Sequence, residues 1–226
     1  MEVTYYGHSC FLVDIGGFRV LFDPYITPNP KASNIDINTI EADYILLSHG
    51  HFDHITDAES IAKRTGATIL ANYEIVTWLG KKGLENTVAM NIGGKVIMDF
   101  AIVKMVNAVH SSQLPDGSYG GAAAGFIIET GQGTFYYSGD TALHMDMKLI
   151  ADMNKIDFAF MSIGDTLTMD IRDAVVAAGF INTKKIIGMH FDTWPNLEID
   201  HEQAGLWASS RMVELYLPEI GETIKM

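Results

Sequence analysis

The stretch His49-Gly50-His51-Phe52-Asp53-His54 decides how this chain is interpreted, because it places three imidazoles and one carboxylate within six residues. It directly follows Asp43–Leu47, a short apolar run typical of a buried strand. Directly after it, Thr56 and Glu59 have the spacing of a helix capping box. The hexapeptide is therefore predicted to lie in a loop between a strand and a helix, at the carboxyl edge of a sheet, where α/β folds bind ligands.

The side chains of the hexapeptide are of metal-ligand type. Imidazole nitrogens and carboxylate oxygens are common protein ligands of zinc-like cations. Four such side chains so close together would crowd a single ion. They can serve two neighbouring ions if His49 and His51 face one ion while Asp53 and His54 face the other. The spacing therefore favours two metal sites.

Three further ligand-type side chains stand at or just after the ends of predicted strands: His110, Asp140 and His190. These strands are Ile102–Val109, Thr134–Ser138 and Lys185–Met189. Because each side chain comes from a loop that follows a strand, all of them can converge with the hexapeptide on one edge of the fold. The chain thus offers enough ligands for two ions.

The order of the predicted elements indicates how the chain is layered. Short strands come first and α/β units follow, and the second half of the chain repeats this order, ending with a predicted helix over His201–Leu217. Two such halves can pack sheet on sheet with helices on the outer faces, which gives a four-layer α-β-β-α sandwich. A three-layer α/β fold fits the order nearly as well, so the metal-ligand residues decide between the two.

The ordered set of the hexapeptide, His110, Asp140 and His190 resembles the metallo-β-lactamase superfamily, and the resemblance runs from Tyr6 to about Trp194. Four smaller motifs are similar to its short branch, which holds L-ascorbate-6-phosphate lactonase and other metal-dependent hydrolases. They are Gly7-His8-Ser9, Ala108-x-His110-Ser111-Ser112, Gly139-Asp140-Thr141 and Thr168-Met169. The resemblance implies an α/β fold, the four-layer α-β-β-α sandwich, formed as one domain over residues 1–226.

The resemblance also implies which residues hold two divalent ions, with Zn²⁺ as the expected metal and Mn²⁺ as the alternative. The first ion is bound by His49, His51 and His110. The second is bound by Asp53, His54 and His190, and Asp140 bridges the two ions.

Two cations a few Å apart lower the pKa of a bridging water, so that hydroxide is available to attack a carbonyl or phosphoryl centre. Asp53 is the expected catalytic residue that orients the hydroxide and accepts its proton. His8 is the second catalytic candidate. It is expected either to protonate a leaving group, to anchor an anionic substrate, or to be only a turn residue bonded to the backbone.

The expected function is hydrolysis of a small ester, lactone or phosphorylated metabolite. A phosphodiesterase of a small cyclic or lipid-like substrate is the first alternative, and a metal-bound binding module without catalysis is the second. A flavodiiron-type redox protein is disfavoured, because that pattern has Glu where this hexapeptide has His51.

Charge and composition limit the partners. The chain has 226 residues with 15 Lys and Arg against 28 Asp and Glu, a net charge of −13, which disfavours nucleic acid. No run of 18 apolar residues predicts a membrane span, and Cys10 is the only cysteine, so no intrachain disulfide can form. We therefore expect a cytoplasmic protein that acts on a small molecule, and the sequence leaves a homo-oligomer open.

Overall fold

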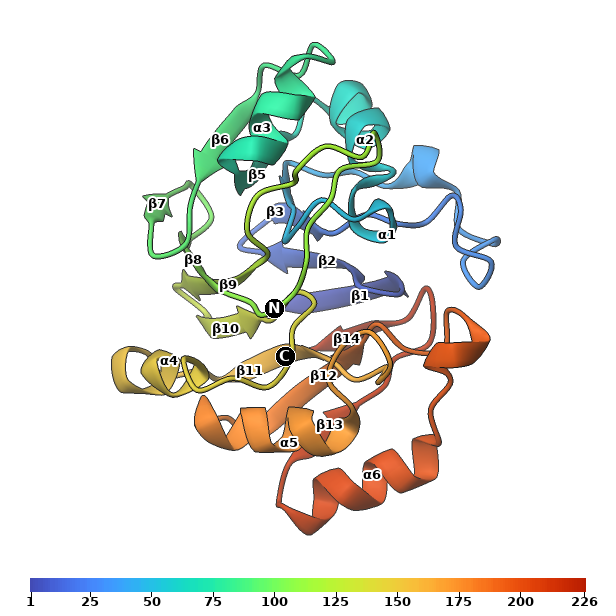
Figure 1. Ribbon diagram of the computed structural model, residues 1–226, viewed down its shortest axis with the longest axis vertical. Helices are drawn as coiled ribbons and strands as arrows, with labels where there is room; N and C mark the ends of the chain where they lie inside the picture. The colour runs from blue at the N-terminus through green and yellow to red at the C-terminus, as the bar shows by residue number, and fades with distance from the viewer.

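The computed structural model describes all 226 residues as two seven-stranded sheets packed face to face (Figure 1). Helices α1, α2 and α3 lie on the outer side of the first sheet, and α4, α5 and α6 on the outer side of the second. The α/β four-layer sandwich predicted from the sequence is therefore confirmed. None of its helices has the length and hydrophobicity that crossing a bilayer requires.

The first sheet has the strand order β14-β1-β2-β3-β4-β5-β6. Its strands are β1 (Glu2–Gly7), β2 (Cys10–Ile15), β3 (Phe18–Phe22), β4 (Tyr44–Leu46), β5 (Thr68–Asn72), β6 (Thr87–Met90) and β14 (Thr223–Lys225). Its helices are α1 (Phe52–Ile55), α2 (Ala58–Thr65) and α3 (Tyr73–Gly80). Because β3, β4, β5 and β6 are parallel, their carboxyl ends point to the same edge.

The second sheet has the order β13-β12-β11-β10-β9-β8-β7. Its strands are β7 (Lys95–Ile97), β8 (Ile102–Asn107), β9 (Ala124–Thr130), β10 (Gly133–Tyr137), β11 (Phe158–Ser162), β12 (Lys185–Met189) and β13 (Glu214–Tyr216). Its helices are α4 (Met147–Met153), α5 (Ile171–Phe180) and α6 (His201–Ser210). Strands β10 to β13 are parallel, so this sheet also presents a row of carboxyl ends.

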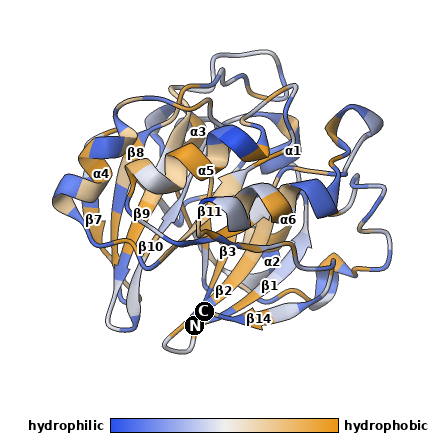
Figure 2. Cartoon of the chain, turned by 90° about the horizontal axis from the view of Figure 1, so that it is seen from below, coloured by the Kyte–Doolittle hydropathy of each residue, from blue (hydrophilic) through white to orange (hydrophobic).

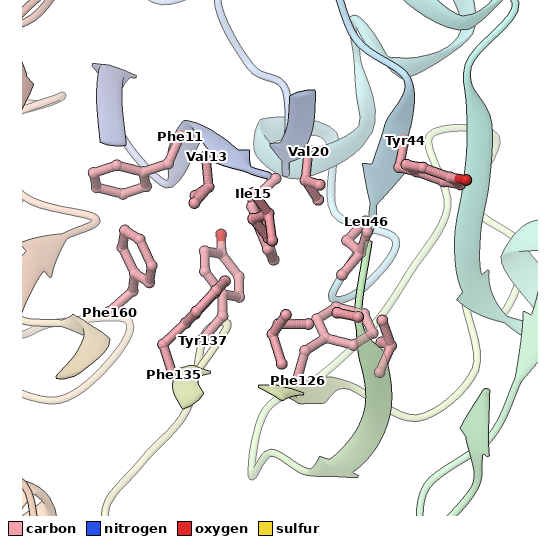
Figure 3. Packing of buried hydrophobic residues seen from close by; sticks show 14 of the residues in the cluster. Phe11, Val13, Ile15, Val20, Tyr44, Leu46, Phe126, Phe135, Tyr137 and Phe160 are labelled. Carbon is pink, nitrogen blue, oxygen red and sulfur yellow. The ribbon is translucent and has the colours of Figure 1, made fainter. Parts of the chain in front are cut away.

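Three apolar clusters separate the four layers. The central cluster of 24 buried residues lies between the sheets, and Figure 3 shows side chains of the first sheet facing those of the second. The rings of Phe11 and Phe160 lie 4.7 Å apart, as do those of Phe22 and Tyr137. The outer clusters of 19 and 18 residues join each sheet to its helices, and Figure 2 shows hydrophobic residues concentrated on strands such as β2 and β3. Each buried Phe contributes about 1.5–3 kcal/mol, so the core supplies stability without the ligand-bearing loops.

The helix predicted over His201–Leu217 is wrong in its second half. Helix α6 ends at Ser210, and β13 follows and pairs in parallel with β12. Val213, Leu215 and Leu217 all pack against the cluster beneath the helices, so the apolar residues alternate with period two, as a strand requires. The chain reverses at Met212, which has a φ of +56°.

The capping box predicted at Thr56 is also wrong. The Thr56 hydroxyl donates to the carbonyl of Phe52 in the preceding turn, and α2 begins after Asp57. The Asp57 carboxylate accepts hydrogen bonds from the backbone N–H groups of Ile26 (2.6 Å) and Thr27 (2.8 Å). Asp57 therefore fixes the loop after β3 against the start of α2.

Candidate metal centre

Loops that follow strands of both sheets meet at one edge of the sandwich and bring all the predicted ligands together. His49 comes three residues after β4, and His190 directly follows β12. His110 and Asp140 come three residues after β8 and β10, respectively. The convergence expected from the ends of the predicted strands is therefore present in the structure.

The hexapeptide changes from an extended segment into one helical turn. His51 is extended, with φ −64° and ψ 148°, and it is the N-cap of α1. Asp53 and His54 lie within α1, where the sequence predicted a loop. The helical turn buries Asp53 and His54. Phe52, which precedes them in the chain, has 52% of its surface exposed. The same six residues thus supply both ligands and part of the surface around them.

Three imidazoles form the first cluster, which we call the imidazole group: His49, His51 and His110. Their ligand atoms all lie within 4.8 Å of one another, and His49 Nε2 is 2.9 Å from His51 Nδ1. His49 is buried, whereas His51 and His110 are partly exposed. The group therefore has three neutral nitrogen donors with one open side, which suits a cation that keeps a position for water or substrate.

The second cluster, which we call the buried group, consists of Asp53, His54 and His190 with His8. Its ligand atoms also lie within 4.8 Å of one another. All four residues are buried, and Asp53 is the most accessible with 7% of its surface exposed. This group combines a carboxylate with imidazoles in a largely buried position.

Asp140 lies between the two groups. Its Oδ2 is 2.9 Å from His190 Nε2 and 3.2 Å from His54 Nε2, both in the buried group. The same oxygen is 3.7 Å from His110 Nε2 in the imidazole group. The Asp140 carboxylate is therefore within reach of imidazoles from both groups.

The chemistry of the donors fits a cation at this point. Asp140 Oδ1 is buried without a hydrogen-bond partner, and His54 Nε2 is buried and faces only the Asp140 carboxylate, although buried polar atoms are nearly always well paired. Leaving such atoms unpaired costs about 1–3 kcal/mol each, and a metal ion satisfies them. Nitrogen and carboxylate donors together match Zn²⁺ and other divalent transition metals.

The ionisation of the cluster supports the same conclusion. Burial opposes the charge on Asp140, but His190 and His54 outweigh it and hold its pKa well below the usual range. Burial likewise disfavours charge on His190, yet Asp140 raises its pKa to about 9. Burial lowers the pKa of His49 well below its usual value, so this imidazole is neutral. The carboxylates therefore favour positive charge at the centre, whether imidazolium or metal ion carries it.

Asp23 is a supporting residue that the sequence interpretation missed. It is fully buried at the end of β3 and accepts hydrogen bonds from Ser48 N (2.8 Å), His54 Nδ1 (2.9 Å) and the Tyr137 hydroxyl (2.8 Å). The Ser48 hydroxyl also donates to it (2.5 Å) and accepts from His49 Nδ1 (3.0 Å). The ring orientations of His49 and His54 are thus fixed, as in other metal sites. The sequence signal that could have identified Asp23 is its position directly after a strand, which it shares with the predicted ligands.

His8 contacts Asp53 but does not line the cavity that Asp53 lines. Its ring is buried, with Nε2 3.1 Å from Asp53 Oδ2 and Nδ1 2.8 Å from Thr193 Oγ1. Burial, followed by the nearby His190, lowers the pKa of His8 to about 3, so the ring is neutral. A carboxylate only accepts, so Nε2 carries the proton and Nδ1 accepts from the Thr193 hydroxyl. Its ring contacts side chains, which contradicts the alternative of a turn residue bonded only to backbone.

One cavity of about 420 Å³ opens onto the cluster. It is lined by His51, Phe52, Asp53, His110, Ser111, Asp140, Leu167, His190 and Trp194. The cavity thus reaches ligands of both groups, whereas His8 is absent from its wall. A small molecule in it would meet Asp53 and Asp140 directly.

Comparisons with known proteins show the family of the chain. The Beta-lactamase superfamily domain matches residues 2–190. The chain is 52% identical over 204 residues to a UPF0173 metal-dependent hydrolase of Methylacidiphilum infernorum, covering 90% of each chain. It is 48% identical over 226 residues to one of Flavobacterium johnsoniae, covering 100% of both.

A solved structure of a metallo hydrolase is also similar to this chain along nearly its whole length. The structure of Igni18, a novel metallo hydrolase from the hyperthermophilic archaeon Ignicoccus hospitalis, is 31% identical, with a TM-score of 0.88 over 99% of this chain and 97% of that one. The fold is also shared by an isothiocyanate hydrolase from Delia radicum gut bacteria, at 16% identity and a TM-score of 0.81 over 100% of this chain and 99% of that one. The chain therefore belongs to the UPF0173 family of metal-dependent hydrolases, within the metallo-β-lactamase superfamily.

Proposed function

We propose that this hydrolase cleaves a small ester or lactone with water, and that its two ligand groups would hold two divalent ions, with Zn²⁺ the expected metal and Mn²⁺ the alternative. The observation that carries the proposal is the position of Asp140, whose Oδ2 lies within 3.7 Å of imidazoles from both groups. Phosphorylated metabolites and phosphodiesters stay as alternative substrates, because the same chemistry acts on phosphoryl centres. The narrower resemblance to L-ascorbate-6-phosphate lactonase stays a prediction.

The assignment of ligands follows the two groups. His49, His51 and His110 would hold one ion, while Asp53, His54 and His190 would hold the other, and Asp140 would contact both. When bound, such ions lower the pKa of water and polarise the bond to be cleaved.

Asp53 is the residue that we assign to the attacking water. It is the carboxylate that belongs to the buried group and also lines the cavity. Burial opposes its charge, but His54, His190 and His8 hold its pKa far below the usual range, so it is ionised and able to accept a hydrogen bond from water. A carboxylate within hydrogen-bond reach of the water orients it and receives its proton.

His8 and Asp23 are assigned as positioning residues. The His8 Nε2–H donates to Asp53 Oδ2 (3.1 Å), which holds the carboxylate in one orientation toward the cavity. Asp23 accepts from His54 Nδ1 (2.9 Å) and leaves Nε2 facing Asp140. This assignment is an alternative to the two roles expected for His8, proton donation and substrate anchoring, and it is supported by the absence of His8 from the wall of the cavity.

The experiment that tests the proposal uses protein loaded with Zn²⁺ or Mn²⁺ and a panel of nitrophenyl esters, lactones and phosphodiesters. We expect ester or lactone turnover, and its loss by about 10²–10⁴-fold in Asp53→Ala, because the variant lacks both the group that receives the proton of the water and one ligand of the buried group. Circular dichroism should be unchanged, since the apolar core does not include Asp53.

Two results would separate the alternatives. Turnover of phosphodiesters alone would favour the phosphodiesterase. Binding of two ions without turnover of any member of the panel would favour the binding module and contradict the proposal.

A further inference from the structure

We propose that the substrate carries an uncharged, apolar group beside the bond to be cleaved, and not a phosphate or carboxylate group there. This inference rests on the proposed hydrolysis for its reacting centre, and it concerns the walls of the same cavity. It distinguishes apolar esters and lactones from phosphorylated substrates, which the chemistry of the metal centre alone does not distinguish.

The mouth of the cavity is built from large apolar side chains. Phe52 from α1 and Leu167 from the loop before α5 line it with 52% and 48% of their surfaces exposed, and Trp194 completes the wall. Three large apolar groups around one opening are typical of a surface that binds an apolar ligand. A bound alkyl or aryl group would remove these side chains from water.

The aromatic part of this wall is held in place before any ligand binds. The ring centroids of Tyr25, Phe52 and Trp194 lie 5.7, 6.0 and 6.1 Å apart, so each ring packs against the other two. The His8 ring also packs edge-on against Trp194, with centroids 5.2 Å apart. Rings fixed in this way lose little entropy on binding, which favours a preformed apolar surface.

Cationic side chains are missing from the same cavity. None of the 15 lysines and arginines lines it. The charged side chains that do line it are Asp53 and Asp140, both assigned to the ions. A phosphate or carboxylate group away from the reacting centre would lose its hydration without gaining a charge-assisted partner of the kind that Arg or Lys supplies.

The test measures binding and not turnover, so that it stays separate from the proposed hydrolysis. Metal-loaded protein is titrated calorimetrically with alkyl hydroxamates of increasing chain length and with hydroxamates of equal length that end in a carboxylate or a phosphonate. All of them share the same metal-binding head, so differences in Kd report on the wall. We expect affinity to rise about fourfold per buried methylene and to fall at least about tenfold with a terminal anion.

Variants of Leu167 sharpen the test. Leu167→Ala should weaken the dependence on chain length, and Leu167→Lys should favour the carboxylate-ended and phosphonate-ended ligands at least about fivefold relative to the alkyl ligand of equal length. Leu206 on α6 is a matched control, since it is 57% exposed and outside the cavity, and its Ala and Lys variants should change neither ratio.

Equal or tighter binding of the anionic ligands to the unmodified protein would overturn the inference, as would an affinity that does not rise with alkyl chain length. A preference for alkyl hydroxamates in a protein that cleaves no ester or lactone would support the apolar wall and contradict only the proposed hydrolysis.

Discussion

The imidazole group and the buried group lie side by side and are built differently. The imidazole group has three neutral nitrogen donors, two of them partly exposed to the cavity. The buried group includes the carboxylate of Asp53, to which its member His8 donates a hydrogen bond, and Asp23 accepts a hydrogen bond from its member His54. Carboxylates neutralise a divalent ion and burial strengthens the attraction, so we infer that the buried group binds its ion more tightly. We therefore expect an ion at the imidazole group to be the one that exchanges more readily and meets substrate.

Removing the link between the groups is expected to have the largest effect. Asp140→Asn should lower the affinity for both ions by more than about 10²-fold, because even residues that only orient ligands contribute about 10–100-fold. Elemental analysis and turnover should fall together. Asp152→Asn on the exposed face of α4 is the control. Two firmly bound ions in Asp140→Asn would show that the groups are independent.

His8 should affect the buried group alone. His8→Ala removes the donor to Asp53, so we expect turnover to fall about 10–100-fold, with equal loss for nitrophenyl and alkyl esters. His8→Gln keeps an N–H donor and should recover part of the loss. The comparison of leaving groups is the decisive measurement. A loss confined to alkyl esters, which need a proton on the leaving group, would restore the role of proton donor.

Asp23 should affect the ion of the buried group more than that of the imidazole group. It contacts His54 directly but reaches His49 only through Ser48. Asp23→Asn is expected to weaken the tighter ion about 10–100-fold and the other ion less. Competition with a chelator measures both constants. Equal weakening of both ions would mean that the groups share one supporting network.

The smallest effect should come from the far end of β4, where Asp43 pairs with Arg19. Hydrogen bonding from Arg19 lowers the pKa of Asp43 below 3.8, so the pair stabilises the fold above pH 4 and loses this contribution as pH falls through the lowered pKa. The pair is partly exposed and is worth about 0.5 kcal/mol. Asp43→Asn should lower Tm by about 1–2 °C at pH 7, and by less at pH 3.

Ion affinities of Asp43→Asn should match those of the unmodified protein, because β4 is held by its neighbours on both sides. A change in either affinity would mean that general stability, and not the local arrangement, controls the centre.

The ligands were predictable because they follow the local pattern of a strand that ends in a metal-type residue. His49, His110, Asp140 and His190 all have this pattern, and the resemblance ordered them into two sets. Asp23 has the same pattern at the end of β3, but a lone Asp before Pro24 is also typical of a turn. Only the tertiary contacts of Asp23 with Ser48, His54 and Tyr137 distinguish a residue that supports the metal centre from an ordinary turn residue.

Short edge elements could not be predicted from the sequence. Strand β14 is three residues long and pairs with β1, so that Glu2 lies opposite Lys225 across almost the whole chain. The sequence predicts a helix where β13 lies, because the period-two pattern of the strand is too short to outweigh the preceding helical residues. The place of His8 depends on contacts 45 and 185 residues away, which no local pattern reveals.

We expect the imidazole group and the buried group each to bind one ion, with different affinities. The most direct test of this expectation is the number of Zn²⁺ ions bound per chain in a chelator-competition titration of the unmodified protein. We predict two ions with clearly different affinities, the tighter one in the buried group and the weaker one lost in His51→Ala. A stoichiometry that never exceeds one ion per chain, even in excess Zn²⁺, would contradict the dinuclear centre.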